Sequence, residues 1–216
     1  MIDAVDKIRH AARAVEALVA THAVGVMWAE PSVLPGYRVG GLAAHLVRGM
    51  ETIRTYVGAD TLIPAGVETV DAPGYYARVL ARHDPLTSEF HAAVRDRGEQ
   101  RVDEGHAALV AAAADAAAWL LATDLDTDRV IAVLDGVTIR VDDYLATRLV
   151  ELAIHSDDLA RSAGMEPPPF DEEIWTAVAE LLAELTLRRH PHRLVALALA
   201  RPDRMDPVGA FTRVPT

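Results

Sequence analysis

The sequence contains no cysteine, and this absence removes several kinds of chemistry at once. Disulfide bonds, thiolate–zinc sites and a thiol nucleophile borne by the protein are all excluded. Any thiol chemistry therefore needs a thiol from outside the chain, and a transition metal would need histidine and carboxylate ligands. Asparagine is also absent and Lys7 is the only lysine, which indicates a GC-rich genome and says nothing about mechanism.

Positive charge is scarce, with 21 basic against 32 acidic residues and a net charge of −11. This balance argues against nucleic acid or an anionic membrane surface as the main partner. It does not exclude a local basic pocket. No apolar run approaches the roughly 20 residues that span a bilayer. Charged residues are scattered through the first 20 positions, so no signal-peptide core is visible there. We therefore expect a soluble cytoplasmic protein with no nucleic-acid or membrane partner.

Aromatic residues are few, at 5%, whereas alanine is abundant, with 39 residues. Alanine has the highest intrinsic helix propensity, and 216 residues with 51% hydrophobic content can bury a substantial core. Hydrophobic residues recur at spacings of three and four along most of the chain, which is typical of amphipathic helices. This pattern predicts an all-α helix bundle with helices over residues 2–24, 39–57, 74–97, 100–122 and 143–163.

Three features interrupt the helical pattern. Runs of β-branched residues flank Asp135-Gly136, which predicts one small β-hairpin over residues 130–141. Glycine and proline residues predict a loop over residues 58–73. The third helix is expected to kink or split at Asp84-Pro85.

The last bundle helix is expected to begin at an N-cap of Asp142 or Asp143 and to end before Gly164. The three prolines that follow at positions 167–169 form a stiff linker. We therefore predict two parts, a helix bundle at residues 1–165 and a C-terminal helical extension packed on it at residues 166–216. The extension is expected to contain helices over residues 171–189 and 191–200.

Glu151 and His155 are four residues apart on the predicted 143–163 helix. This spacing stacks their side chains on one face, with Cβ atoms roughly 5–6 Å apart, as in the zinc-binding H-E-x-x-H helix. A third ligand would come from a facing helix, where His45 lies at the edge of the apolar stripe. Edge positions on two facing helices converge at the rim of a bundle, partly buried yet open to a substrate. The pattern thus indicates a metal site at His45, Glu151 and His155.

Other interpretations of these residues remain open at this point. Arg148 lies three residues before Glu151 and would compete for its carboxylate as a plain ion pair. A lone histidine such as His45 is more often one whose hydrogen bonds are satisfied within a helix interface. The turn that contains His190 and His192 is a weaker candidate for a metal site. The same residues are equally expected in a solvent-exposed connection between helices.

Two short segments resemble the signatures of a known family. Residues 34–46, L-P-G-Y-R-V-G-G-L-A-A-H-L, resemble the loop-to-helix signature of the mycothiol-dependent maleylpyruvate isomerase family, a group of DinB-like metal-binding four-helix bundles. Residues 151–159, E-L-A-I-H-S-D-D-L, resemble its second signature, E-x-x-x-H-x-x-D-L. The resemblance covers about residues 1–165 and implies that His45, Glu151 and His155 are metal ligands. It also matches Asp158, for which we expect a structural role such as orienting a ligand.

The resemblance implies an enzyme that uses a divalent metal, zinc or else nickel or another ion. Mycothiol would be the thiol cosubstrate and a small electrophile the substrate of thiol transfer or isomerisation. The family's isomerases carry a separate C-terminal α/β domain that contributes to the active site, whereas only about 50 residues follow the bundle here and they have a helical pattern. Arg78, Arg82 and Arg148 are candidate anion clamps, or else surface charges.

Three other functions fit the same residues. A metal-bound water could hydrolyse an amide or ester. A bundle that holds a metal or a small ligand without turnover is a second alternative, and a purely structural module of a homodimer is a third. We assign no catalytic side chain beyond the three ligands.

Overall fold

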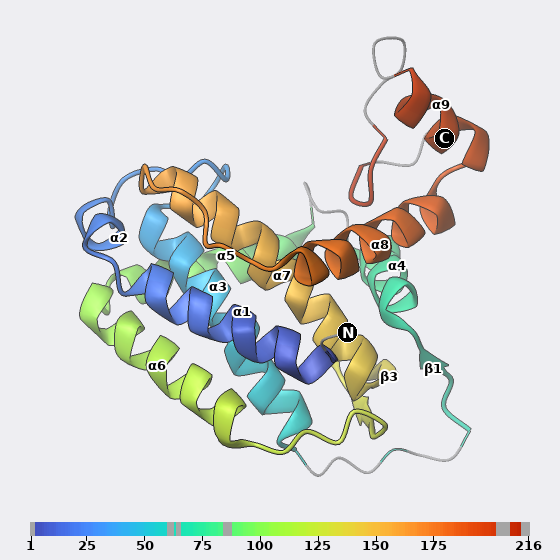
Figure 1. Ribbon diagram of the computed structural model, residues 1–216, viewed down its shortest axis with the longest axis horizontal. Coiled ribbons are helices and arrows are strands. Elements are labelled where there is room, and N and C mark those ends of the chain that lie inside the picture. Colours follow the sequence, from blue (N-terminus) through green and yellow to red (C-terminus); the bar gives the residue numbers. More distant parts are fainter. Residues whose placement is uncertain (1–2, 60–62, 64–65, 84–87, 202–207, 213–216) are drawn as a thin grey trace.

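The computed structural model describes residues 3–59, 63, 66–83, 88–201 and 208–212. Figure 1 shows a mostly helical molecule with a small sheet at one end, which confirms the predicted fold class. Four helices that pack on one another form the bundle: α1 (Ala4–Val19), α3 (Val39–Val57), α6 (His106–Ala122) and α7 (Val141–Ser162).

The apolar stripes of these four helices meet in one core. Large side chains fill its centre, and the fully buried ones include Ile8, Leu42, Met50, Leu120 and Leu152. Helix α6 contributes mainly alanines to this core, and their small side chains let neighbouring helices approach closely. Burial of this apolar area is the main stabilising contribution to the bundle.

The first helix is shorter than predicted. It ends at Val19, and a separate short helix α2 (His22–Val26) follows, so the single helix expected over residues 2–24 is wrong. Thr21 causes the break, because its backbone is extended and its hydroxyl accepts a hydrogen bond from the Val24 amide as an N-cap.

The predicted third and fourth helices have different boundaries in the structure. Helix α4 (Ala72–Arg82) and helix α5 (Glu89–Val102) divide the first segment, and the Asp84-Pro85 step lies outside the described residues. Helix α6 starts at His106 and not at residue 100, because the chain turns at Gly105, whose φ of +90° disfavours other residues.

Helix α3, which carries His45, is held tightly against α5. A Cβ atom on Gly98 of α5 would lie 2.9 Å from the carbonyl oxygen of Gly41, so only glycine permits this approach. Nearby, Glu99 accepts hydrogen bonds from the Arg38 backbone amide at 2.8 Å and from its guanidinium at 2.6 Å. These contacts fix the first turns of α3, whose bounds match the prediction.

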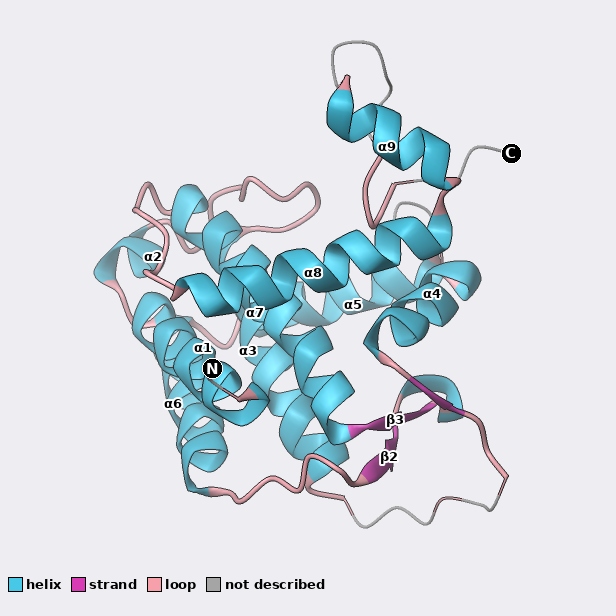
Figure 2. Ribbon diagram, turned by 45° about the vertical axis from the view of Figure 1, so that its right-hand side comes forward, coloured by secondary structure: helices cyan, strands magenta, loops and turns pink. Residues whose placement is uncertain are grey.

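The predicted hairpin is present as part of a larger sheet. Strands β2 (Val130–Ala132) and β3 (Thr138–Arg140) pair antiparallel and are joined through a 3-10 turn at Leu134–Gly136. A third strand, β1 (Thr69–Val70), pairs parallel with β3, giving the order β1-β3-β2 (Figure 2). The prediction of a loop throughout residues 58–73 is therefore wrong at this strand and at the start of α4.

The expected N-cap of α7 is also wrong. Arg140 occupies that position without a side-chain cap, and both aspartates lie within the first helical turn. Asp143 instead accepts a hydrogen bond from the Ala72 amide at 3.0 Å. It therefore satisfies a backbone N–H group at the start of α4 and not one of its own helix. At the other end, Gly164 adopts a φ of +66° just after α7, as expected for a helix-closing glycine.

Helix α8 (Glu172–Arg189) lies across α4 and α7, and the short helix α9 (His192–Ala200) follows it. Apolar side chains on one face of α8 are buried, namely Ile174, Val178, Leu181 and Leu185. Arg188 forms a two-pronged ion pair with Asp71, at 2.7 and 2.6 Å, and Asp71 is the N-cap of α4. The division of the chain at residue 165 stays a prediction.

Within the described residues, no single helix has the length and apolar character needed to cross a membrane. Helices α5 and α6 meet such a criterion only as a pair, and they are bent by 115° at their junction.

Candidate metal centre

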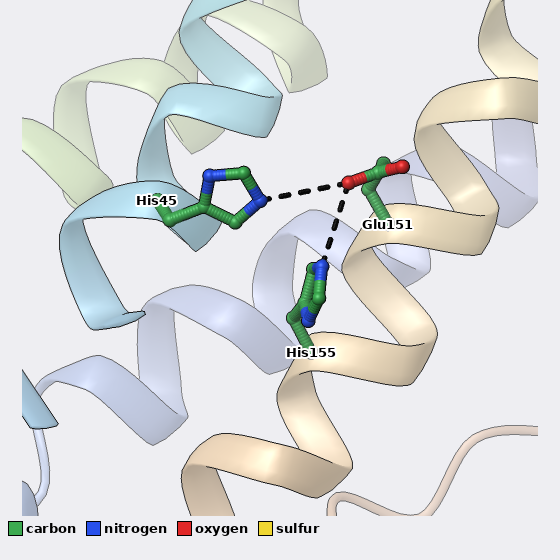
Figure 3. A group of neighbouring side chains, drawn as sticks. All are labelled: His45, Glu151 and His155. Carbon is green, nitrogen blue, oxygen red and sulfur yellow. Dashed lines mark ion pairs between the residues drawn. The ribbon is translucent and has the colours of Figure 1, made fainter. Parts of the chain in front are cut away.

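Two helices of the bundle bring three ligand-capable side chains together. His45 lies in the second turn of α3, and Glu151 and His155 lie one turn apart in the middle of α7. Figure 3 shows the three side chains pointing into a common space between the helices. One ligand atom from each residue lies within 4.8 Å of the other two, and this is the one such group of three among the residues that the structure describes.

The two distances from Glu151 to the histidines are longer than those of good hydrogen bonds. Glu151 Oε2 lies 3.6 Å from His45 Nε2 and 3.5 Å from His155 Nε2 (Figure 3). Good hydrogen bonds between such groups are about 2.7–3.2 Å long. Ligand atoms placed about 2.0–2.1 Å from a tetrahedral zinc ion are about 3.3–3.4 Å from one another. The separation of Glu151 from each histidine is therefore close to that of two ligands on one ion.

The outer atoms of two of these residues are held in place by neighbours. Asp158 Oδ2 lies 3.0 Å from His155 Nδ1, so the carboxylate can accept the ring N–H and leave Nε2 free to bind a metal. The hydroxyl of Tyr76 on α4 lies 3.1 Å from Glu151 Oε1 and 2.9 Å from the carbonyl oxygen of Thr147. Such outer contacts are typical of metal-binding histidines and carboxylates.

The third residue is enclosed mainly by rings. His45 Nδ1 is buried and has no hydrogen-bond partner among the described residues. The ring of Tyr37 lies 5.7 Å from that of His45, and the His155 ring lies 4.9 Å away at a steep angle. The His45 side chain is only 16% exposed, so its Nε2 atom faces the triad and not bulk solvent.

The electrostatics of the triad favour an ionised Glu151 carboxylate and a protonated His155 ring. Burial alone would raise the pKa of Glu151, but His155, His45 and Arg148 outweigh it and hold that pKa well below its usual range. Burial lowers the pKa of His155, yet Asp158 and Glu151 overcome this effect and raise it to about 9. Burial also lowers the pKa of His45, and Glu151 opposes that shift. Without a metal, a proton on His155 therefore balances the Glu151 carboxylate.

The alternative explanation of Glu151 as a partner of Arg148 does not match the structure. Among the described residues, Arg148 has no carboxylate within ion-pair distance; its Nε donates to the Thr147 hydroxyl at 3.2 Å. Arg78, another candidate clamp, forms an exposed ion pair with Glu68 at 2.5 Å.

Several of the remaining histidines have structural contacts instead. His10 pairs with Asp171 at 3.1 Å, and His106 Nε2 lies 2.7 Å from the carbonyl oxygen of Val19. His190 Nε2 lies 3.1 Å from the Gly209 carbonyl oxygen, so it ties the end of α8 to the C-terminal segment. These contacts explain the three histidines without a metal.

Tyr76 is the residue at this site that sequence reasoning missed. It belongs to α4, and no local pattern links a tyrosine in that helix to a glutamate on α7. Burial, together with the charge of Glu151, raises the pKa of the Tyr76 hydroxyl well above its usual range, so the group stays a hydrogen-bond donor. The local sequence around Tyr75 and Tyr76 does not predict a contact with a metal ligand.

An open groove of about 980 Å³ lies away from the triad. It is lined by one side of α1 together with the proline linker and the start of α8, including Lys7, Arg13, Met165, Pro168 and Ile174. None of the three triad residues lines this groove.

One comparison with known proteins gives a match. The family model described as the mycothiol maleylpyruvate isomerase N-terminal domain matches residues 8–160, which include the whole triad and Asp158. No curated protein and no solved structure matches the chain.

Proposed function

The chain belongs to the family defined by the mycothiol maleylpyruvate isomerase N-terminal domain, and from this premise we propose that it is a metal-dependent enzyme that uses a small external thiol. Its reaction would be thiol transfer to, or thiol-assisted isomerisation of, a small electrophile. The observation that carries the proposal is the placement of both histidine Nε2 atoms 3.5–3.6 Å from one oxygen of Glu151.

Three protein ligands are typical of catalytic zinc, whereas structural zinc sites have four. His45, Glu151 and His155 would hold the ion and leave a coordination position for another molecule. A divalent metal bound there would supply a Lewis acid that favours the thiolate form of an incoming thiol at neutral pH. Because the chain has no cysteine, that thiol has to come from solution.

The surrounding side chains keep the ligands in the binding geometry. Asp158 fixes the orientation of the His155 ring and directs its Nε2 atom into the triad. Tyr76 binds the oxygen of Glu151 that faces away from the histidines, so Oε2 stays free for the ion. All three ligands are partly buried, which limits the access of water to the site.

Turnover assays with and without mycothiol test this function. The zinc-loaded protein is mixed with mycothiol and 1-chloro-2,4-dinitrobenzene, where sulfur bonds to the ring carbon, chloride leaves and the thiol proton goes to solvent. Maleylpyruvate serves as the isomerisation probe. We expect turnover of a probe that requires both mycothiol and metal and that is lost with a chelator or in the His155→Ala variant. The His10→Ala variant, which removes a histidine paired with Asp171 elsewhere on the molecule, serves as the matched control.

Two results would contradict the proposal. Turnover that persists in excess chelator or in the His155→Ala variant would exclude the metal-dependent mechanism. Hydrolysis of ester or amide probes at the same rate without any thiol would assign the site to metal-bound water instead.

A further inference from the structure

A segment near the C-terminus folds back onto the end of α8. His190 Nε2 lies 3.1 Å from the Gly209 carbonyl oxygen and 3.3 Å from the Thr212 hydroxyl oxygen. Arg189, the residue before this histidine, donates a hydrogen bond to the carbonyl oxygen of Ala210. Ala210 is itself buried against the hydrophobic core. These contacts dock the segment on the helical extension.

The segment is closed by its own hydrogen bonds, and we call it the C-terminal turn (residues 209–212). The Thr212 amide donates to the Gly209 carbonyl oxygen at 3.2 Å, and the Gly209 amide donates to the Thr212 hydroxyl at 3.0 Å. Phe211 lies within this closed turn. Its ring centre is 5.6 Å from that of Tyr76, with 77° between the ring planes, which is a favourable edge-to-face arrangement.

Tyr76 connects the C-terminal turn to the metal centre. Its side chain is buried, and its hydroxyl lies 3.1 Å from Glu151 Oε1 and 2.9 Å from the carbonyl oxygen of Thr147. Phe211, by contrast, is 44% exposed, so one side of its ring contacts Tyr76 and another faces solvent. The Phe211 ring therefore covers part of the Tyr76 ring.

We propose that Phe211 is a positioning residue of the metal centre and acts through Tyr76. Its ring holds the Tyr76 ring in place, so the tyrosine hydroxyl stays on Glu151 Oε1 while Oε2 faces the histidines. The inference rests on the proposed function, because a metal has to bind at the triad. The family model ends at residue 160, so this contribution comes from a part of the chain outside the matched domain.

Competition with water is the physical reason for this role. A hydrogen bond between a hydroxyl and a carboxylate is stronger where water is excluded, because water offers both groups other partners. Loss of the Phe211 ring would expose Tyr76 to solvent and free its ring to move. The Glu151 carboxylate would then be held less firmly, and outer contacts of this kind determine how well a ligand binds its metal.

The zinc affinity of full-length variants tests the proposal without relying on turnover. Competition with a chromogenic chelator should show a loss of about 3–10-fold for Phe211→Ala, which is smaller than the roughly 10–100-fold loss typical of removing a direct outer contact. Phe211→Tyr keeps the ring and should bind zinc as tightly as the wild type. Leu187→Ala is the matched control, because it truncates an apolar side chain of similar exposure on α8. Circular dichroism confirms that each variant is folded.

A double-mutant cycle separates this role from general packing. If Phe211 acts through the Tyr76 hydroxyl, Phe211→Ala should have almost no effect on zinc affinity in the Tyr76→Phe protein. A merely structural role would give the same loss in both backgrounds. An equal loss, or a Phe211→Ala protein that binds zinc within about twofold of the wild type, would overturn the inference and leave the proposed function standing.

A wild-type protein that binds no zinc would instead exclude the proposed function. The same cycle is then measured by urea unfolding of the metal-free protein. If Phe211 holds the Tyr76 hydroxyl on Glu151, Phe211→Ala should reduce the folding equilibrium constant by a factor at least about twofold larger in the wild-type background than in Tyr76→Phe. Equal factors in the two backgrounds would overturn the link between the C-terminal turn and the triad.

Discussion

The Nε2 atom of His45 lies 3.6 Å from the Oε2 atom of Glu151, although the two residues are far apart in the sequence and belong to different helices. This distance is too long for a strong hydrogen bond and close to the separation of two ligands on a tetrahedral ion. His155 has the same relationship to the same oxygen, at 3.5 Å. The shared oxygen is therefore the point around which the bundle arranges its histidines.

Removing the carboxylate behind His155 should weaken metal binding without abolishing it. Asp158→Asn loses the negative charge that holds the His155 ring through Nδ1, and changes of this kind typically cost about 10–100-fold in metal affinity. Competition with a chromogenic chelator measures the affinity. Asp157→Asn is the matched control, because Asp157 pairs with Arg161 and should leave zinc affinity unchanged. An unaltered affinity in Asp158→Asn would show that this contact does not support the ligand.

The metal-free protein should lose stability as the pH rises from 6.5 to 9. The pKa of His155 is raised from 6.5 to about 9, so its protonated form stabilises the fold fully below pH 6.5 and this contribution disappears through pH 9. The pKa of Glu151 is lowered, so its contribution would be lost only under acidic conditions, outside this interval. The linked change is up to about 3 kcal/mol in the free energy of unfolding.

Urea denaturation of the metal-free wild type and the His155→Gln variant, at several pH values, isolates this effect. We expect the difference in stability between the two proteins to shrink steadily across the interval. A difference that stays constant from pH 6 to pH 10 would contradict the assignment of a raised pKa to His155.

Replacing Tyr76 with phenylalanine should loosen Glu151 while the fold is kept. The ring still packs between Tyr75 and Phe211, but the hydroxyl that contacts Glu151 Oε1 at 3.1 Å is removed. We expect zinc affinity to fall by about 10-fold or more, as for other outer contacts of a metal ligand. Tyr56→Phe is the control, since Tyr56 packs against Tyr144 rather than against the triad. Equal losses in both variants would assign the effect to general packing.

The close approach of α3 and α5 gives a test of the fold that supports His45. In an open helix, replacing glycine with alanine increases stability by up to about 1 kcal/mol. At Gly98 the added methyl group would lie 2.9 Å from the Gly41 carbonyl oxygen, which cannot move without shifting α3. We expect Gly98→Ala to lower the free energy of unfolding by about 1–3 kcal/mol. A more stable variant would show that the two helices are not held so closely.

The features that the sequence predicts well are those with a local physical cause. The stripe of α3 gives its bounds directly, and the spacing of Glu151 and His155 places both on one face of α7. The i, i+3 spacing likewise brings Asp158 to His155. His45 follows from its position at the edge of an apolar stripe, and the family signatures identify it as the third member.

The features that the sequence does not predict depend on contacts between distant segments. Strand β1 has two residues, and its pairing with β3 gives it a regular structure that its own composition does not indicate. Asp143 accepts a hydrogen bond from the amide of Ala72 instead of from its own helix, because α4 begins nearby. Tyr76 reaches Glu151 only through the packing of separate helices.

The stoichiometry of zinc binding tests the central claim most directly. Protein purified without a nickel column is stripped with a chelator, dialysed against zinc and analysed for metal per chain, together with the His45→Ala, Glu151→Gln, His155→Ala and His10→Ala variants. The account predicts about one tightly bound ion in the wild type and in His10→Ala, and an affinity lower by more than about 100-fold in the three triad variants, because two ligands hold a divalent ion poorly. Wild-type protein that binds no zinc, nickel or other divalent ion, or triad variants that bind as tightly as the wild type, would contradict it.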